Sequence, residues 1–461
     1  MNRAPAPFPQ AGTRSRRLDR LLYAAGLDFD VLLTLLFRSW TIFAGGATAL
    51  LVPTFLSPSQ QGYYYTFSAV LATQVFFELG LNHVLVQLTS HAAAHLRRVS
   101  ETRFEGDVRW RYAIASLLTL SSKWNSVMAS IFFVALLFGG VWLFSDKGSL
   151  PTSQWMTTWV VLIGATAVNL AFSARLAICE GLGEVGHIAR LRLRQSIAGY
   201  SLLWLLLAYG AGLWATAAVP IVNAIGTVWW LSRRRLTKSL DLQEPSPASD
   251  WSYSYRGDVF PLQWRIALSW VSGFFIFNFL TPIIFVHQGE VAAGRIGLGL
   301  TIFTAISTIG YSWISAATPS LSAHIARKER AKLNSLFKRQ ATRGIGATLL
   351  CAGGFLVAVQ FSGHLVPKLL ERLPPMPVLL LLFVTTVVNT VVFSMAAYMR
   401  AHKEEPMLAP SMVSALLIGA GAIVMAQYGL IAVVSTYVVV NVTVTLPWCV
   451  LLFVRYQRRV V

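Results

Sequence analysis

The 461-residue chain is too apolar to be a water-soluble protein: 55% of its residues are hydrophobic, 12% are charged and its mean hydropathy is +0.59. So few polar side chains cannot cover a water-facing surface of that size, and the composition predicts an all-α polytopic membrane protein. Lys and Arg outnumber Asp and Glu by 38 to 19, a net charge of +19 that would indicate a nucleic-acid partner in a soluble protein.

Residues 1–30 are basic and lack the apolar core and small-residue cleavage site of a signal peptide, so we expect an N-terminal tail that is retained. Two long apolar runs follow at 31–56 and 63–91, separated by the turn-forming sequence SPSQQG. This pattern predicts a transmembrane helical hairpin. Each run carries one charge, Arg38 and Glu78, and charges at that depth usually face a partner, a cavity or a pathway.

Twelve apolar runs are long enough to be transmembrane helices. The Pro- and Ser-rich linker 233–262 divides six of them, in an N-lobe at 31–232, from six in a C-lobe at 263–454, and residues 455–461 form a C-terminal tail. The predicted helices fall near 31–56, 63–91, 124–145, 156–178, 196–214, 216–232, 264–286, 291–318, 341–362, 377–399, 407–426 and 430–454.

The basic residues indicate the orientation of these helices. Of the 38 Lys and Arg residues, 31 fall in the tails, the linker and the loops on one side of the predicted membrane. By the positive-inside rule that side is cytoplasmic, so we expect both termini to be cytoplasmic. The charge is then mainly a topology signal, with attraction to anionic lipids as a second effect, and no nucleic-acid partner is expected.

The loops separate two classes of membrane protein. The cytoplasmic connection 92–123 mixes Arg with Trp, Tyr and Leu, which favours an interfacial amphipathic helix. The longest loop on the outer side, 363–376, has only about fourteen residues, and no Asp-x-Asp pair or His/Glu cluster is placed for catalysis. Transport is therefore a better class than enzymatic glycan assembly. No metal or other cofactor is indicated, and the three cysteines are isolated: Cys179, Cys351 and Cys449.

An internal repeat is suggested by shifting the chain by 227 residues. The shift places Arg38 on Arg265 and the pair Gln61-Gly62 on Gln288-Gly289, so a charged helix start and a Gln-Gly turn recur together. Glu78 falls on Ala305 and has no equivalent.

The intramembrane charges allow two interpretations. Arg38 and Glu78 lie at similar depth on adjacent antiparallel helices, so they form a structural ion pair, or else Glu78 is a coupling or gating carboxylate. Arg265 and Arg295 lie near helix ends, from which each could snorkel. Together with Arg38 they favour an anionic ligand, because the guanidinium fork binds phosphate oxygens bidentately.

Asn residues are spread one to a helix, and two of them, Asn82 and Asn278, are candidate substrate-binding residues. Interhelical hydrogen bonding is the commoner role of such residues. The alternative is a cavity that offers amide groups to sugar hydroxyls. These six residues place one Asn within each of six predicted helices: Asn82, Asn169, Asn223, Asn278, Asn389 and Asn441.

Several short motifs resemble one family. LSPSQQGYYYTF at 56–67 and FFELGL at 76–81 are similar to the first hairpin of bacterial polysaccharide (O-antigen and exopolysaccharide) flippases, and ATPSLSAHIARKERAKLNSLFKR at 317–339 resembles their Pro-x-Leu-Ser stretch and basic connector. EGLGEVGHIARLRL at 180–193 resembles their connector after the fourth helix. This family belongs to the superfamily of multidrug, oligosaccharidyl-lipid and polysaccharide exporters.

The resemblance implies two six-helix lobes around a central cavity and alternating access in the bacterial inner membrane. Its implied cargo is a polyprenyl-diphosphate-linked oligosaccharide for surface polysaccharide assembly. Membrane lipids, a polysaccharide polymerase and glycosyltransferases are the implied partners. Two alternatives stay open, a cation-coupled exporter of small organic molecules and a membrane enzyme of glycan assembly. Arg38, in place of an acidic cavity residue, disfavours cationic drugs.

Overall fold

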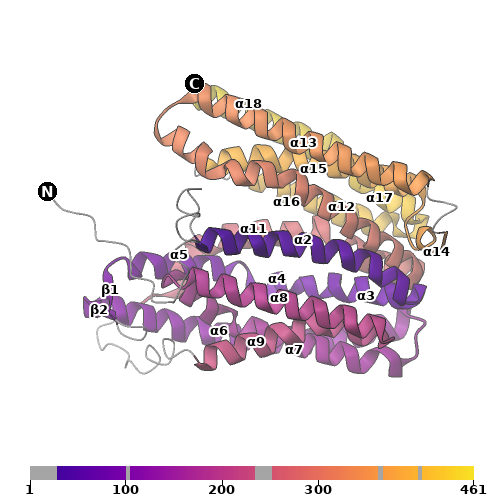
Figure 1. The fold of residues 1–461 in the computed structure, drawn as a ribbon, viewed down its shortest axis with the longest axis horizontal. Coiled ribbons are helices and arrows are strands. Elements are labelled where there is room, and N and C mark those ends of the chain that lie inside the picture. Colours follow the sequence, from indigo (N-terminus) through magenta and orange to yellow (C-terminus); the bar gives the residue numbers. More distant parts are fainter. Residues whose placement is uncertain (1–28, 100–103, 234–251, 362–366, 403–406, 461) are drawn as a thin grey trace, which may run out of the picture.

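The computed structural model describes residues 29–99, 104–233, 252–361, 367–402 and 407–460 (Figure 1). The described chain is all-α except for one small β-hairpin, as predicted. Nearly all of the predicted N-terminal tail and most of the predicted linker lie outside the described residues.

The first half of the chain forms a bundle of antiparallel helices, which we call the first bundle. A 3₁₀ turn (Ala72–Gln74) separates α3 from α4, and another (Gly212–Ala217) precedes α9. Its elements are α2 (Phe29–Phe55), α3 (Pro58–Leu71), α4 (Val75–Glu78), α5 (Leu81–Ala93), β1 (Leu96–Arg98), β2 (Phe104–Gly106), α6 (Val108–Lys147), α7 (Thr152–Gly181), α8 (Val185–Ala208) and α9 (Ala218–Arg233).

The second half forms the second bundle. A π-helix (Tyr255–Val259) opens it, and another (Asn441–Thr445) joins α17 to α18. Its helices are α11 (Phe260–Phe277), α12 (Leu280–Ala326), α13 (Arg330–Phe361), α14 (Pro367–Leu370), α15 (Met376–Ala401), α16 (Leu408–Met425), α17 (Leu430–Val440) and α18 (Leu446–Val460).

The helices are compatible with about twelve membrane crossings. Eight segments of the described chain are long and apolar enough to cross a membrane, and the pair Pro58–Glu78 and Leu81–Ala93, bent by 44°, makes a ninth. One of the eight, Tyr255–Ala326, contains two predicted spans, because α12 breaks at Gly289. The helix α2 matches the predicted span 31–56, and α8 overlaps the predicted span 196–214 but begins earlier, at Val185, and ends earlier, at Ala208.

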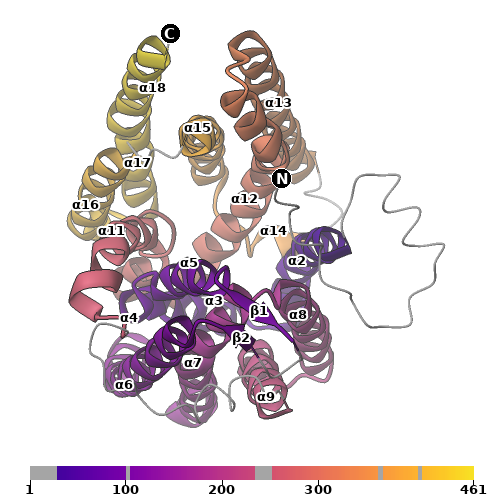
Figure 2. The same ribbon diagram turned by 90° about the vertical axis from the view of Figure 1, so that its left-hand side faces the viewer.

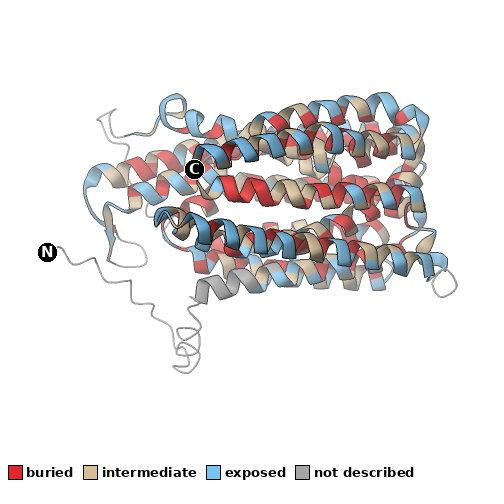
Figure 3. Cartoon of the chain, turned by 90° about the horizontal axis from the view of Figure 1, so that it is seen from above, coloured by how far each residue is buried: buried red, intermediate tan, exposed pale blue. Residues whose placement is uncertain are grey.

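The outer faces of the helices suit a bilayer. Exposed residues lie along the outer helices drawn in Figure 3, between intermediate and buried ones, and many of the exposed residues are large and apolar. Phe138, Leu350 and Leu416 are 71%, 78% and 71% exposed. Since apolar side chains at such exposures are costly in water and favourable in lipid, these faces are explained by a surrounding membrane.

The helix directions give the molecule two ends. At the basic end α8 and α13 begin and α12 and α18 finish, with Arg and Lys residues around them. At the far end α3 begins and α12 breaks. The two bundles lie closer together at the far end than at the basic end (Figure 1), and α11 lies between them, packed on α4 and on α16 (Figure 2).

The first hairpin turns more tightly than the sequence predicted. We expected the whole of SPSQQG to be a turn, but only Leu56 and Ser57 lie between the helices. The Ser57 side chain accepts a hydrogen bond from the backbone of Gln60, and the Gln60 side chain accepts one from the backbone of Ser57. This capping box, with Pro58 in the first turn, starts α3 immediately.

Three connections also differ from prediction. The described residues of 92–123 do not form a separate interfacial helix: β1 and β2 pair in antiparallel register, Leu96 opposite Gly106, and α6 then runs without interruption from Val108. The predicted linker turns helical at Tyr255, before its predicted end at 262. The predicted C-terminal tail continues α18 to Val460.

Candidate functional site

At the far end, the two bundles contact each other where α3 crosses α12, and glycines allow the two backbones to approach closely. A Cβ added at Gly62 of α3 would lie 2.0 Å from the carbonyl oxygen of Glu290 in α12, and one at Gly294 would lie 2.8 Å from the nitrogen of Gly62. Gln61, which is buried, donates through Nε2 to the carbonyls of Gly294 (2.9 Å) and Arg372 (3.2 Å). This contact closes the space between the bundles at the far end.

Glu290 is a buried carboxylate in this contact that the sequence analysis missed. Gly289 has φ +83°, which breaks α12 and turns Glu290 toward the first bundle. The hydroxyl of Ser149, in the loop between α6 and α7, donates to Glu290 Oε1. The signal that could have found Glu290 is its place directly after Gln288-Gly289, the turn that the suggested repeat matches.

The two repeated glutamines play similar parts. Gln61 donates to the backbone of the second bundle, and Gln288 donates through Nε2 to the carbonyl of Ala426 at 3.1 Å. Both lie at the far end, Gln61 in the first turn of α3 and Gln288 directly before the break of α12 at Gly289. The repeat stays a hypothesis, with this equivalence in its favour.

Glu78 lies at a break in its helix. Leu79 and Gly80 have φ +48° and +69°, both left-handed, and end α4 before α5 begins. The Glu78 carboxylate accepts a hydrogen bond from Asn82 Nδ2, and Asn82 Oδ1 accepts one from the hydroxyl of Ser173 in α7 at 3.4 Å. Asn82 therefore has the interhelical role that the sequence analysis gave as the commoner one, and it orients a half-buried carboxylate.

Of the three candidate Arg residues, the structure describes the side chains of Arg265 and Arg295, and these lie at opposite ends of the molecule. Arg38 lies in α2, but its side chain is outside the described part. Arg265 is exposed near the basic end of α11, with its guanidinium 5.2 Å from the ring centre of Trp264. Arg295 lies beyond Gly289 at the far end, where its Nε donates to the carbonyl of Glu371 at 3.0 Å.

Arg372 in the same far-end loop is also constrained. Its carbonyl accepts the hydrogen bond from Gln61, and burial lowers the pKa of its guanidinium, although the nearby Glu371 carboxylate acts in the opposite direction.

At the basic end, the hydrogen bonds from Lys332 and His324 hold the pKa of Glu329 below its usual value. These contacts fix loops rather than form a reaction centre.

A pocket of about 190 Å³ opens in the second bundle among α11, α12, α15 and α17. Asn389 donates through Nδ2 to the hydroxyl of Tyr437 at 3.2 Å, and the hydroxyl of Ser307 is buried without a partner. Asn278 caps α11 one residue after the pocket residue Phe277 but does not line the pocket. The lining combines hydroxyl, amide and aromatic groups without a charge: Phe277, Leu300, Phe303, Thr304, Ser307, Thr308, Tyr311, Leu382, Thr385, Thr386, Asn389, Phe393 and Tyr437.

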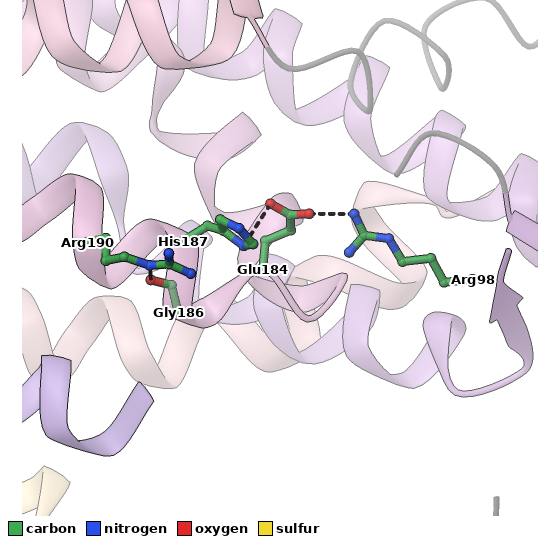
Figure 4. A network of polar contacts seen from close by, with 5 residues as sticks. All are labelled: Arg98, Glu184, Gly186, His187 and Arg190. Carbon is green, nitrogen blue, oxygen red and sulfur yellow. Dashed lines mark hydrogen bonds and ion pairs between the residues drawn. The ribbon is translucent and has the colours of Figure 1, made fainter. Parts of the chain in front are cut away.

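An ion pair ties the β-hairpin to the first bundle at the basic end (Figure 4). Arg98 of β1 reaches Glu184, just before α8, at 2.6 Å, and His187 lies 3.6 Å from the other oxygen of the same carboxylate. Among the described residues, no three His, Cys, Asp or Glu side chains converge as metal ligands.

Comparison with known proteins identifies the fold. No family model and no curated protein matches the chain. Among solved structures, an inward-facing conformation of a multidrug resistance MATE family transporter of the MOP superfamily is similar over 92% of this chain and 99% of that one, with a TM-score of 0.68 at 14% identity. The chain has the fold of the MOP superfamily transporters.

Two further structures support this conclusion. The inward closed conformation of the lipid II flippase MurJ gives a TM-score of 0.57 at 13% identity, covering 90% of this chain and 87% of that chain. A MOP superfamily transporter from Pyrococcus furiosus gives 0.54 at 16% identity, covering 93% and 94%. These neighbours are transporters and a flippase rather than enzymes, and the MOP fold accounts for both the polytopic architecture and the two bundles.

Proposed function

We propose that this protein is a flippase that moves a polyprenyl-diphosphate-linked oligosaccharide across the bacterial inner membrane by alternating access, for surface polysaccharide assembly. The bundles are joined at the far end by Gly62, Gln61 and Glu290 and lie farther apart at the basic end, as expected of a transporter closed on one side. Transport then requires this far-end contact to open.

The uncharged pocket of the second bundle is the observation that carries the proposal. Its Thr, Ser and Asn groups can exchange hydrogen bonds with sugar hydroxyls, and its Phe rings offer negative faces to sugar C–H groups. The buried, unpartnered hydroxyl of Ser307 is a donor that a ligand would satisfy. At about 190 Å³ the pocket is below the usual 300–1,000 Å³ of ligand sites, which suits one sugar unit of a longer chain.

The diphosphate is assigned to Arg38 and Arg265. The suggested repeat relates these two residues, and the exposed guanidinium of Arg265 lies where the bundles are apart. A guanidinium keeps its charge when it is desolvated and can bind two phosphate oxygens. Arg295 donates a hydrogen bond to the loop at the far end, so its proposed role is to stabilise the contact between the bundles there. Glu78 is proposed as a coupling or gating carboxylate.

Cation-coupled export of small organic molecules is the second candidate function. The MATE neighbours and the two carboxylates Glu78 and Glu290 favour it. A cationic cargo is disfavoured, because a cation in the second-bundle pocket would be buried without an opposite charge, which is costly.

Surface glycan in a strain that depends on this protein tests the proposal, normalised to the amount of protein in the membrane. We expect the double change Thr304→Val and Ser307→Ala, which removes two pocket hydroxyls, to lower export. The matched control is Thr301→Val, whose hydroxyl bonds to the carbonyl of Gly297 in its own helix and does not line the pocket.

The Arg residues are tested in the same assay. We expect Lys at Arg38 or Arg265 to lower export partly and Ala to abolish it, with unchanged membrane abundance. Wild-type export from the double Ala variant would rule out the diphosphate site. Loss of resistance to cationic drugs on deletion, with normal surface glycan, would favour the cation exporter instead.

A further inference from the structure

A second pocket, of about 290 Å³, lies between α8 and α9 at the basic end, away from the space between the bundles. Figure 2 shows α9 at the edge of the first bundle, on the side opposite the second. The pocket combines basic, aromatic and apolar residues and contains no carboxylate: His187, Arg190, Leu191, Arg194, Gln195, Ala198, Val222, Gly226, Trp229 and Trp230.

Two guanidinium groups in this pocket are available for a ligand. Arg190 and Arg194 lie one turn apart on α8 and therefore share a face of the helix. Arg190 donates through Nε to the carbonyl of Gly186 at 3.2 Å (Figure 4), and neither Arg forms an ion pair with a described carboxylate. The nearby acids are engaged elsewhere: Glu184 by Arg98 and His187, and Glu180 by Arg192.

Close packing between α8 and α9 forms the rest of the pocket. Gln195 donates through Nε2 to the carbonyl of Asn223 (2.9 Å) and to the hydroxyl of Thr227 (3.0 Å), which fixes α8 against α9. A Cβ at Gly226 would lie 2.8 Å from the same Nε2, so the glycine leaves room for the Gln195 side chain to make these hydrogen bonds. The side chains of Ala198, Val222 and Trp229 then form an apolar wall beside the Arg pair.

The combination matches one end of a lipid. Two adjacent guanidinium groups without ion-pair partners bind phosphate oxygens, and an apolar wall that continues along membrane-exposed helices receives an acyl chain. Trp229, which is 50% exposed, is of the residue type that concentrates at the membrane interface. Free phosphate would use the Arg pair but leave the apolar wall in water.

We propose that the pocket between α8 and α9 binds the phosphate head group of an anionic phospholipid, with Arg190 and Arg194 on the phosphate and the first acyl carbons against Ala198, Val222 and Trp229. The bound lipid would hold the basic ends of α8 and α9 together. The proposal requires membrane insertion but not a particular cargo, so it stands or falls independently of the proposed flippase function.

Native mass spectrometry of the purified full-length protein with added phosphatidylglycerol or phosphatidylcholine tests this site. We expect phosphatidylglycerol to bind more strongly to the wild type. The double change Arg190→Gln and Arg194→Gln should weaken that binding by about ten-fold or more, because two charge-assisted hydrogen-bonding groups are lost. The control Arg192→Gln with Lys338→Gln removes the same charge at the same end, outside the pocket, and should bind like the wild type.

A variant that does not change the charge distinguishes binding in this pocket from general electrostatic attraction between anionic lipid and a basic protein. Ala198→Trp fills the apolar part from an exposed position and should also weaken phosphatidylglycerol binding while leaving a monodisperse protein. Equal binding of the two lipids, or an equal loss in the control variant, would overturn the proposal. Displacement of the lipid by inorganic phosphate as readily as by short-chain phosphatidylglycerol would also overturn it, since the site would then recognise phosphate alone.

Discussion

The environment of Glu78 makes the two roles open to it testable by a single substitution. Its carboxylate is oriented by Asn82, which is held in turn by Ser173 of α7, so it has a fixed direction. Glu78→Gln keeps the size of the side chain and one oxygen that can accept the hydrogen bond from Asn82, and it removes the charge. The substitution is therefore a test of charge rather than of packing.

We expect Glu78→Gln to lower transport by about ten-fold or more, equivalent to about 1.4 kcal/mol in the barrier, with unchanged membrane abundance. Normalised surface glycan is the measurement. The Arg38→Gln single change and the double change complete the cycle. A double variant that folds and transports better than either single one would show a structural ion pair and end the coupling role.

The sequence allows only part of this site to be predicted, for a physical reason. Glu78 is conspicuous because it interrupts an apolar run, whereas Glu290 follows a Gln-Gly turn and resembles an ordinary loop residue. Glu290 is buried only because Gly62, more than 200 residues earlier, approaches its backbone. The pocket around Ser307 is likewise formed by four helices that no periodicity brings together.

The crossing of α3 and α12 depends on the absence of a side chain at one position. We expect Gly62→Ala to weaken this crossing by about 1–3 kcal/mol, because the new methyl group would overlap the Glu290 carbonyl. Gly46→Ala in α2 is the control, since nothing lies within 4 Å of a Cβ there.

Thermal unfolding in detergent gives the comparison. Gly62→Ala should lower the midpoint, and Gly46→Ala should leave it unchanged or raise it, because alanine favours a helix over glycine by about 1 kcal/mol. Equal midpoints for the two variants would contradict the tight crossing.

The helices themselves could be predicted better than their ends. Apolar length locates the spans, but the start of α3 is decided by the capping box at Ser57, and the break before α5 by the left-handed Leu79 and Gly80. Residues 108–123 join α6 although their Arg residues suggested a separate surface helix. A hydropathy pattern detects burial in lipid and does not distinguish one long helix from two.

The orientation of the whole molecule rests on the distribution of its basic residues. A reporter fused after Arg235 should be cytoplasmic and one fused after Lys147 external, since 31 of the 38 Lys and Arg residues lie in segments on the Arg235 side. Alkaline phosphatase and fluorescent-protein fusions give opposite signals for the two locations. An external signal after Arg235 would contradict both the orientation and the twelve-helix arrangement.

Alternating access requires the two bundles to separate at the far end, which a reversible cross-link can prevent. Ser149 and Glu290 are joined there by a hydrogen bond between the bundles. With Cys179, Cys351 and Cys449 replaced by Ala, the pair Ser149→Cys and Glu290→Cys should be bridged by a short bis-methanethiosulfonate reagent. We expect this cross-link to stop transport, and a reductant to restore it.

The control pair lies within one bundle. Glu180 and Arg192 form a 2.9 Å ion pair between α7 and α8, so Glu180→Cys with Arg192→Cys should cross-link with the same reagent and leave transport intact. Both cysteine pairs react with the same reagent, but only the Ser149–Glu290 pair joins the two bundles, which must move relative to one another in alternating access. Continued transport with the Ser149–Glu290 cross-link in place would show that the far end stays shut throughout the cycle, and the alternating-access proposal would then be wrong.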